Sequence, residues 1–128
     1  MHIDLVTVVV DDYDSAIAFY TGVLGFELAE DSPSTTTDGR PKRWVVVRPP
    51  GGGTGLLLAR ADGPVQEAVV GEQWAGRVGL FLRVDDFDAT LERLRTAGAE
   101  IVRPPRQQDY GWVAVFRDLA GNLWDLLS

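Results

Sequence analysis

The sequence predicts an α+β fold made of two copies of one β-α-β-β-β unit. The first observation is a repeat, because the segment VDDYDSAI at residues 10–17 returns as VDDFDATL at residues 84–91. The second is that an apolar run precedes each copy. The third is that an apolar-periodic stretch follows each copy and ends near a glycine, Gly25 or Gly98. Such self-similarity indicates a duplicated supersecondary unit, and a cleft between paired units is a common place for small molecules.

The first half is predicted to contain one helix and four strands. Residues 3–10 are continuous and largely β-branched, which is typical of a strand buried on both faces. Asp12 is a suitable N-cap for a helix that runs to about Thr21. Residues 31–40 are rich in Ser, Thr, Asp, Pro and Gly and are expected to form a mobile loop. Three further strands are expected at residues 26–30, 43–48 and 55–59.

The second half repeats this order after a linker, in which Pro64–Gln73 is expected to form a short helix. A helix is predicted from Asp86 to Ala97, with Gly98 as its left-handed terminator. Strands are expected at residues 78–84, 100–102, 110–117 and 123–127. We therefore expect a single domain over residues 1–128, with modules at about 1–64 and 77–128 and a linker at about 65–76.

The composition is that of a globular protein, with 45% hydrophobic and 24% charged residues. No apolar run approaches the roughly 18 residues of a membrane span, and no signal-peptide pattern is visible. The absence of cysteine excludes disulfides and thiolate metal sites, and it fits a cytoplasmic protein. The net charge of −7 argues against a nucleic-acid partner. The negative charge either attracts a cationic ligand through the electric field of the whole protein or only keeps the protein soluble.

The ordered motifs resemble those of the vicinal oxygen chelate superfamily, which includes glyoxalases, extradiol dioxygenases and bleomycin resistance proteins. The matching segments are residues 10–20 and 23–26 in the first half, and 84–87, 97–98 and 116–126 in the second. The resemblance implies two curved sheets that face a central cavity, and a homodimer. The motif residues themselves are predicted to be structural, because aspartates cap helices and Gly121 permits a positive φ in a turn.

The resemblance also implies metal-ligand positions, and this sequence fills only one of them. Leu5 and Gly79 replace the histidine expected seven residues before each helix-capping aspartate. The strand at residues 56–59 offers no ligand, and Asp125 stands where a glutamate is expected. His2 lies at an odd offset from Leu5 and therefore on the opposite strand face. Since a divalent ion needs three or four protein ligands, we expect no metal site and no cofactor.

If the ligand positions face the cavity, strand alternation places neighbouring residues of the same strands beside it. These residues are Leu5, Thr7, Val9, Gly79, Phe81, Arg83, Leu123, Asp125 and Leu127. The lining would be apolar with one cation and one anion. Arg83 and Asp125 either fix a polar ligand or pair with each other.

Aromatic side chains stack on planar ligands and attract cations, and four tryptophans are many for this length. Trp44 and Trp112 are assigned to the cavity, with core packing as the alternative. Trp74 is assigned there too, with an interface anchor as the alternative, whereas Trp124 has the parity of a residue under a helix. The predicted ligand-binding residues are Thr7, Trp44, Arg48, Trp74, Phe81, Arg83, Tyr110, Trp112 and Asp125.

Three functional hypotheses follow. The first is a metal-free protein of the bleomycin resistance type that binds a small ligand, cationic or planar, as a homodimer without nucleic-acid or membrane partners. The second is a lyase, isomerase or dioxygenase-like enzyme with a rearranged site that uses Asp125, Glu72 and Tyr110 as acid–base groups. The third is a degenerate scaffold that acts through protein partners. The missing metal ligands favour the first hypothesis.

Overall fold

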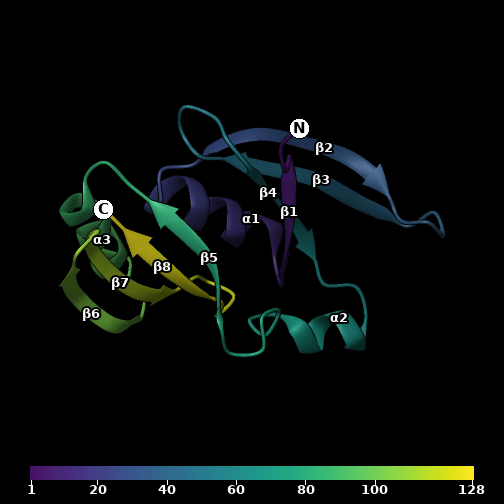
Figure 1. Cartoon of the computed structure of the whole chain (residues 1–128). Coiled ribbons are helices and arrows are strands. Elements are labelled where there is room, and N and C mark those ends of the chain that lie inside the picture. Colours follow the sequence, from purple (N-terminus) through teal and green to yellow (C-terminus); the bar gives the residue numbers. More distant parts are fainter.

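The computed structural model describes all residues from Met1 to Ser128. It contains two βαβββ modules, each with a four-stranded mixed sheet, which confirms the predicted fold class (Figure 1). The first module comprises β1 (Leu5–Val10), α1 (Tyr13–Ile17), its π-helical continuation η1 (Ala18–Val23), β2 (Glu27–Thr35), β3 (Pro41–Arg48) and β4 (Gly55–Arg60). After α2 (Pro64–Val69), the second comprises β5 (Val78–Arg83), α3 (Phe87–Thr96), β6 (Ile101–Gln108), β7 (Gly111–Arg117) and β8 (Leu123–Leu127).

The two sheets share one topology, as a duplicated unit requires. The strand orders are β1-β4-β3-β2 and β5-β8-β7-β6. In each sheet the first strand pairs in parallel with the last, and the other pairs are antiparallel. No helix is long and apolar enough to cross a membrane.

The repeated motif forms the start of each main helix. Asp12 Oδ2 accepts a hydrogen bond from the Ser15 backbone N–H at 2.8 Å. Asp86 Oδ1 accepts the equivalent bond from Ala89 N–H at 3.0 Å. Each aspartate thereby satisfies a backbone donor that the first helical turn leaves without a partner.

One hydrophobic core joins the two modules. It contains residues from α1, η1 and α3 and from one face of each sheet. Tyr20 of η1 makes the link between modules, because its ring lies 6.0 Å from the ring of Trp124 on β8. Trp124 also stacks on Phe116 at 5.8 Å, and both are buried. The predicted position of Trp124 under a helix is therefore confirmed.

The helices cover only one face of each sheet. On β1, Val8 and Val10 are buried, whereas Thr7 before them is exposed and Val9 between them is only partly buried. On β5, Leu80 and Leu82 pack against the core while Phe81 is 64% exposed. The prediction that the first strand is buried on both faces is therefore wrong. The continuous apolar run reflects one face in the core and one face that is only partly covered.

Two strands extend further than the sequence indicates. The predicted loop at residues 31–40 is wrong for residues 31–35, which belong to β2 and pair with β3 from Asp31–Val45 to Thr35–Pro41. Similarly, the strand expected at 100–102 is β6, which continues to Gln108 through Pro104 and Pro105 with two register shifts. Both segments are poor in strand-forming residues, and the neighbouring strand supplies the pairing that holds them extended.

Candidate functional site

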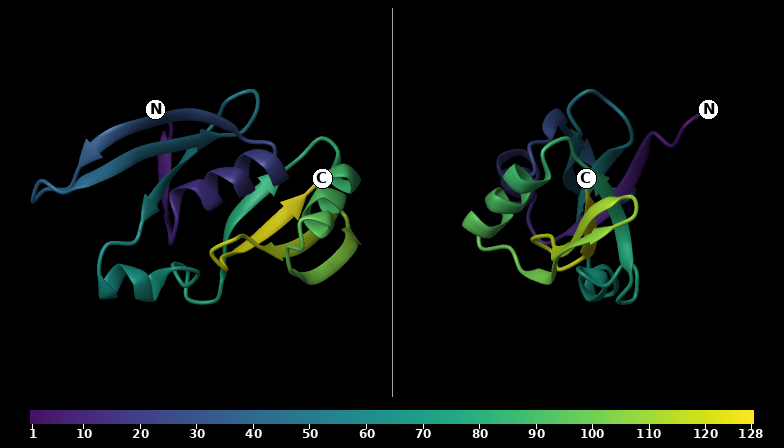
Figure 2. Two further views of the ribbon diagram at one scale, coloured as in Figure 1. Left: turned by 180° about the vertical axis from the view of Figure 1, so that it is seen from behind. Right: turned by 60° about the vertical axis from the view of Figure 1, so that its left-hand side comes forward.

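A pocket of about 390 Å³ lies where β3 and β4 separate. These strands pair with each other only at Val46–Leu57 and Val47–Leu56. Beyond this point the hairpin of β2 and β3 projects from the molecule, while β4 turns towards α2 (Figures 1 and 2). The pocket is lined by apolar β4 residues, by Trp44 of β3 and by charged residues of the hairpin and of the β4–α2 connection.

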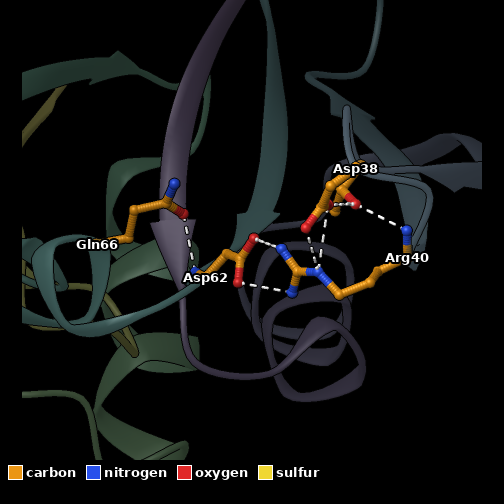
Figure 3. Close-up of polar contacts among 5 residues, drawn as sticks. Asp38, Arg40, Asp62 and Gln66 are labelled. Carbon is orange, nitrogen blue, oxygen red and sulfur yellow. Dashed lines mark hydrogen bonds and ion pairs between the residues drawn. The ribbon is translucent and has the colours of Figure 1, made fainter.

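An ionic clasp joins the hairpin to the start of α2 (Figure 3). The Arg40 guanidinium donates to both carboxylate oxygens of Asp62, at 3.0 and 2.7 Å. Its Nε donates to Asp38 at 3.0 Å. Asp62 also donates its backbone N–H to Gln66 Oε1 at 2.8 Å. The hydrogen bond from Arg40 lowers the pKa of the Asp62 carboxyl. The pKa of the Asp38 carboxyl is also lowered, chiefly by its hydrogen bond from Thr36.

A second arginine is held in the same way on the helix side of the pocket. Arg43 donates to Asp31 at 3.1 and 2.7 Å and to Asp14 at 2.9 Å. Its guanidinium lies 5.0 Å from the ring centre of Tyr13. The Arg43 backbone N–H donates to Tyr13 Oη at 3.3 Å. These carboxylates therefore neutralise Arg40 and Arg43, whereas the pocket residues Lys42 and Arg60 form no ion pair.

The predicted ligand-binding residues do not form one group. Trp44 lines the pocket just described. Phe81 and Asp125 are register partners on the helix-free face of the second sheet. Trp74 joins that face, because a Cβ built on Gly79 of β5 would lie 2.0 Å from its indole ring. Thr7 lies on the corresponding face of the first sheet, where it is exposed.

The other predicted residues lie elsewhere or are already engaged. Arg48 donates to Asp4 Oδ1 at 2.8 Å and to the Gly53 carbonyl at 3.1 Å, and so ties down the chain terminus and the β3–β4 loop. Arg83 donates to the Ser128 carbonyl and forms no ion pair with Asp125. Tyr110 is exposed at the β6–β7 turn. Val113 shares the face of Asp125, and Trp112 alternates with Val113, so Trp112 projects from the face of β7 opposite to that of Asp125.

The positions at which the superfamily places metal ligands do not fit a metal here. Leu5 carries no donor atom, and the ring of Trp74 lies directly over Gly79, in the place of a side chain. β4 offers no metal ligand beside its neighbour β1, since its residues are apolar up to Ala59 and it ends in Arg60. Across the chain, no three His, Asp or Glu side chains lie close enough together to hold a metal ion. Asp125 is one carboxylate among apolar neighbours.

Sequence reasoning missed the charged residues of the pocket. Arg40, Lys42, Arg60 and Asp62 flank the ends of strands, where charged residues are common. These four residues line one pocket because the pocket forms where β3 and β4 move apart. No local sequence pattern indicates where two strands move apart. The run of Arg40, Lys42 and Arg43 around Pro41 was the one available signal, since it concentrates positive charge in an acidic chain.

Comparison with known proteins places the chain in a family. The sequence profile of the Glyoxalase/Bleomycin resistance protein/Dioxygenase superfamily matches residues 2–126. An uncharacterized protein from Shewanella frigidimarina is 54% identical over 124 residues, which cover 96% of this chain and 90% of that protein.

Two solved structures are similar over nearly the whole chain. UcmS2 is 34% identical, with a TM-score of 0.79 and coverage of 99% of this chain and 97% of the other. TnmS3, an antibiotic binding protein from Streptomyces sp. CB03234, is 34% identical, with a TM-score of 0.75 and coverage of 99% and 94%. The chain therefore belongs to the glyoxalase/bleomycin resistance protein/dioxygenase superfamily.

Proposed function

We propose that this protein binds a small organic molecule, without a metal ion and without changing the ligand chemically. The observation that carries this proposal is the 34% identity, over 99% of the chain, to TnmS3, an antibiotic binding protein. The residues at the superfamily's metal positions support it, because they supply one carboxylate instead of a ligand set. We extend the proposal to a homodimer whose ligand is planar.

The pocket between β3 and β4 is the first place where such a ligand would bind. Its volume of about 390 Å³ lies within the usual range of ligand sites. Trp44 is 36% exposed and offers an aromatic surface to the pocket. The helix-free face with Trp74, Phe81 and Asp125 is the second place, and in a homodimer it would be enclosed by the partner.

The test is a titration with antibiotics that include planar aromatic compounds and glycopeptides, followed by tryptophan fluorescence. We expect saturable quenching by at least one compound, and recovery of that compound unchanged by mass spectrometry. Trp44→Phe should remove most of the quenching, whereas Trp74→Phe should retain it. The reverse pattern would move the ligand to the helix-free face of the second sheet. Turnover of the compound, or no response across the panel, would contradict the proposal.

A further inference from the structure

We infer that the pocket between β3 and β4 selects a planar aromatic anion, whose negative group is held by Lys42 and Arg60. This inference rests on the proposed function, because it names the chemical class of the ligand. It reverses the expectation of a cationic ligand that the net charge suggests.

The lining of the pocket is more basic than the protein as a whole. The whole chain carries −7, but four of the residues that line the pocket are basic and one, Asp62, is acidic. A ligand inside a pocket responds mainly to the charges around it, since more distant surface charges are screened within about 10 Å at ordinary salt. Asp14, Asp31 and Asp38, which pair with Arg40 and Arg43, lie within this distance, and with them the charges around the pocket balance. The preference for an anion therefore depends on direct contact with Lys42 and Arg60.

Two of the four cations remain available to a ligand. Arg40 is fully occupied by Asp38 and Asp62, and Arg43 by Asp31 and Asp14. Lys42 and Arg60 form no ion pair. The field of Arg60 contributes to the lowered pKa values of Asp12 and Asp62, but neither carboxylate lies within ion-pair distance of it. An anionic ligand would give these two side chains the partner that they lack.

The rest of the pocket suits the planar part of the same ligand. Leu57 and Ala59 project from one face of β4, and Trp44 shares its face of β3 with Lys42. An aromatic ring between these apolar side chains would contact the indole while its anionic group reached Lys42. The Arg40–Asp62 clasp ties the hairpin that carries Lys42 to the segment that follows Arg60, so that these two chain segments are joined before the ligand arrives.

The experiment compares three ligands that share one ring system and carry substituents of different charge, by isothermal titration calorimetry at low salt. The probes are anthracene-2-carboxylate, the neutral anthracene-2-carboxamide and the cationic 2-(aminomethyl)anthracene. We expect the carboxylate to bind about tenfold more tightly than the carboxamide, as for a charge-assisted hydrogen bond. The double variant Lys42→Gln/Arg60→Gln should reduce this preference to about onefold while leaving the affinity for the carboxamide unchanged. High salt should weaken only the carboxylate.

Arg103→Gln/Arg106→Gln is the matched control, since it removes two charges from β6 of the other sheet and should leave the preference intact. Equal binding of the carboxylate and the carboxamide to the unaltered protein would overturn the inference and leave the proposed function standing. Tighter binding of the cation would also overturn it. Binding of none of the three probes would overturn the inference and count against the proposed function as well. A preference that persists in the double variant would overturn the assignment to Lys42 and Arg60.

Discussion

At the scale of single residues, Asp118 is the polar centre of the fold. This carboxylate is 5% exposed, in the turn between β7 and β8. Its Oδ1 accepts from the backbone N–H groups of Ala120, Gly121 and Asn122 at 2.9–3.0 Å. Its Oδ2 accepts from Tyr20 Oη at 2.8 Å and from Trp124 Nε1 at 3.0 Å. A buried charge is tolerated when donors surround it in this way, so the motif is structural.

Tyr20 makes the stability of the protein sensitive to alkaline pH. Burial, and then the charge of Asp118, raises the pKa of Tyr20 well above its ordinary value of 10.0. The folded state therefore keeps the proton where the unfolded state loses it, and stability that is complete below pH 10 falls as the pH rises further. Tyr20→Phe should lose about 1 kcal/mol at pH 7, where one hydrogen bond is missing. Between pH 10 and 11 it should lose less stability than the unaltered protein.

Urea denaturation at pH 7, 10 and 11 measures both effects. Tyr110→Phe is the control, because this tyrosine is exposed at a turn and lies outside the network. A parallel loss of stability with pH in Tyr20→Phe and in the unaltered protein would contradict the assignment to Tyr20.

At the scale of elements, a single side chain completes the outer edge of β1. Gln73, between α2 and β5, accepts from Val9 N–H at 2.7 Å and donates to the Thr7 carbonyl at 3.0 Å. Its carboxamide thus makes the two bonds that a neighbouring strand would make. An unpaired strand edge promotes association with other chains, so Gln73 protects this edge as well as tying the linker to the first module.

Replacing Gln73 should therefore loosen β1 locally. Gln73→Ala should cost about 1–2 kcal/mol of unfolding free energy and speed hydrogen exchange at the amide of Val9. Gln73→Glu should not rescue it, because its second oxygen would face the Thr7 carbonyl. Gln107→Ala, on the exposed surface of β6, is the control. Unchanged protection of Val9 in Gln73→Ala would show that the edge does not depend on this side chain.

The elements that the sequence predicts well are those with a local cause. Local sequence patterns reveal the apolar runs of β1 and β5 and the capping residues Asp12 and Asp86. The fold class follows from these patterns. The extension of β2 and the edge bond of Gln73 depend on partners far along the chain. The same holds for the site: the sequence predicts Trp44, but Lys42 and Arg60 line the same pocket only because of how β3 and β4 are arranged in the fold.

At the scale of the whole molecule, the helix-free faces of the sheets are only partly covered, since Val113 and Val115 are buried on the face of Asp125 but Phe81 is not. The helices and one core occupy the inner face of each sheet. On the second sheet Phe81 is 64% exposed in the middle of a strand, next to Asp125. An exposed apolar position within a sheet marks an interaction surface when neighbouring residues extend it. The homodimer that the superfamily resemblance implies would cover this face, and it stays a prediction.

Phe81→Glu tests this arrangement by placing a charge where a second copy would bury an aromatic ring. We predict that the unaltered protein sediments as a dimer at micromolar concentration and that Phe81→Glu sediments as a monomer, because an unpaired buried charge is costly at an interface. Val65→Glu is the matched control, since Val65 is 82% exposed and lies on α2, outside both sheets. A monomeric unaltered protein would contradict the dimer. Loss of the dimer in Val65→Glu alone would move the interface to α2, and the face with Phe81 would then be open to a ligand.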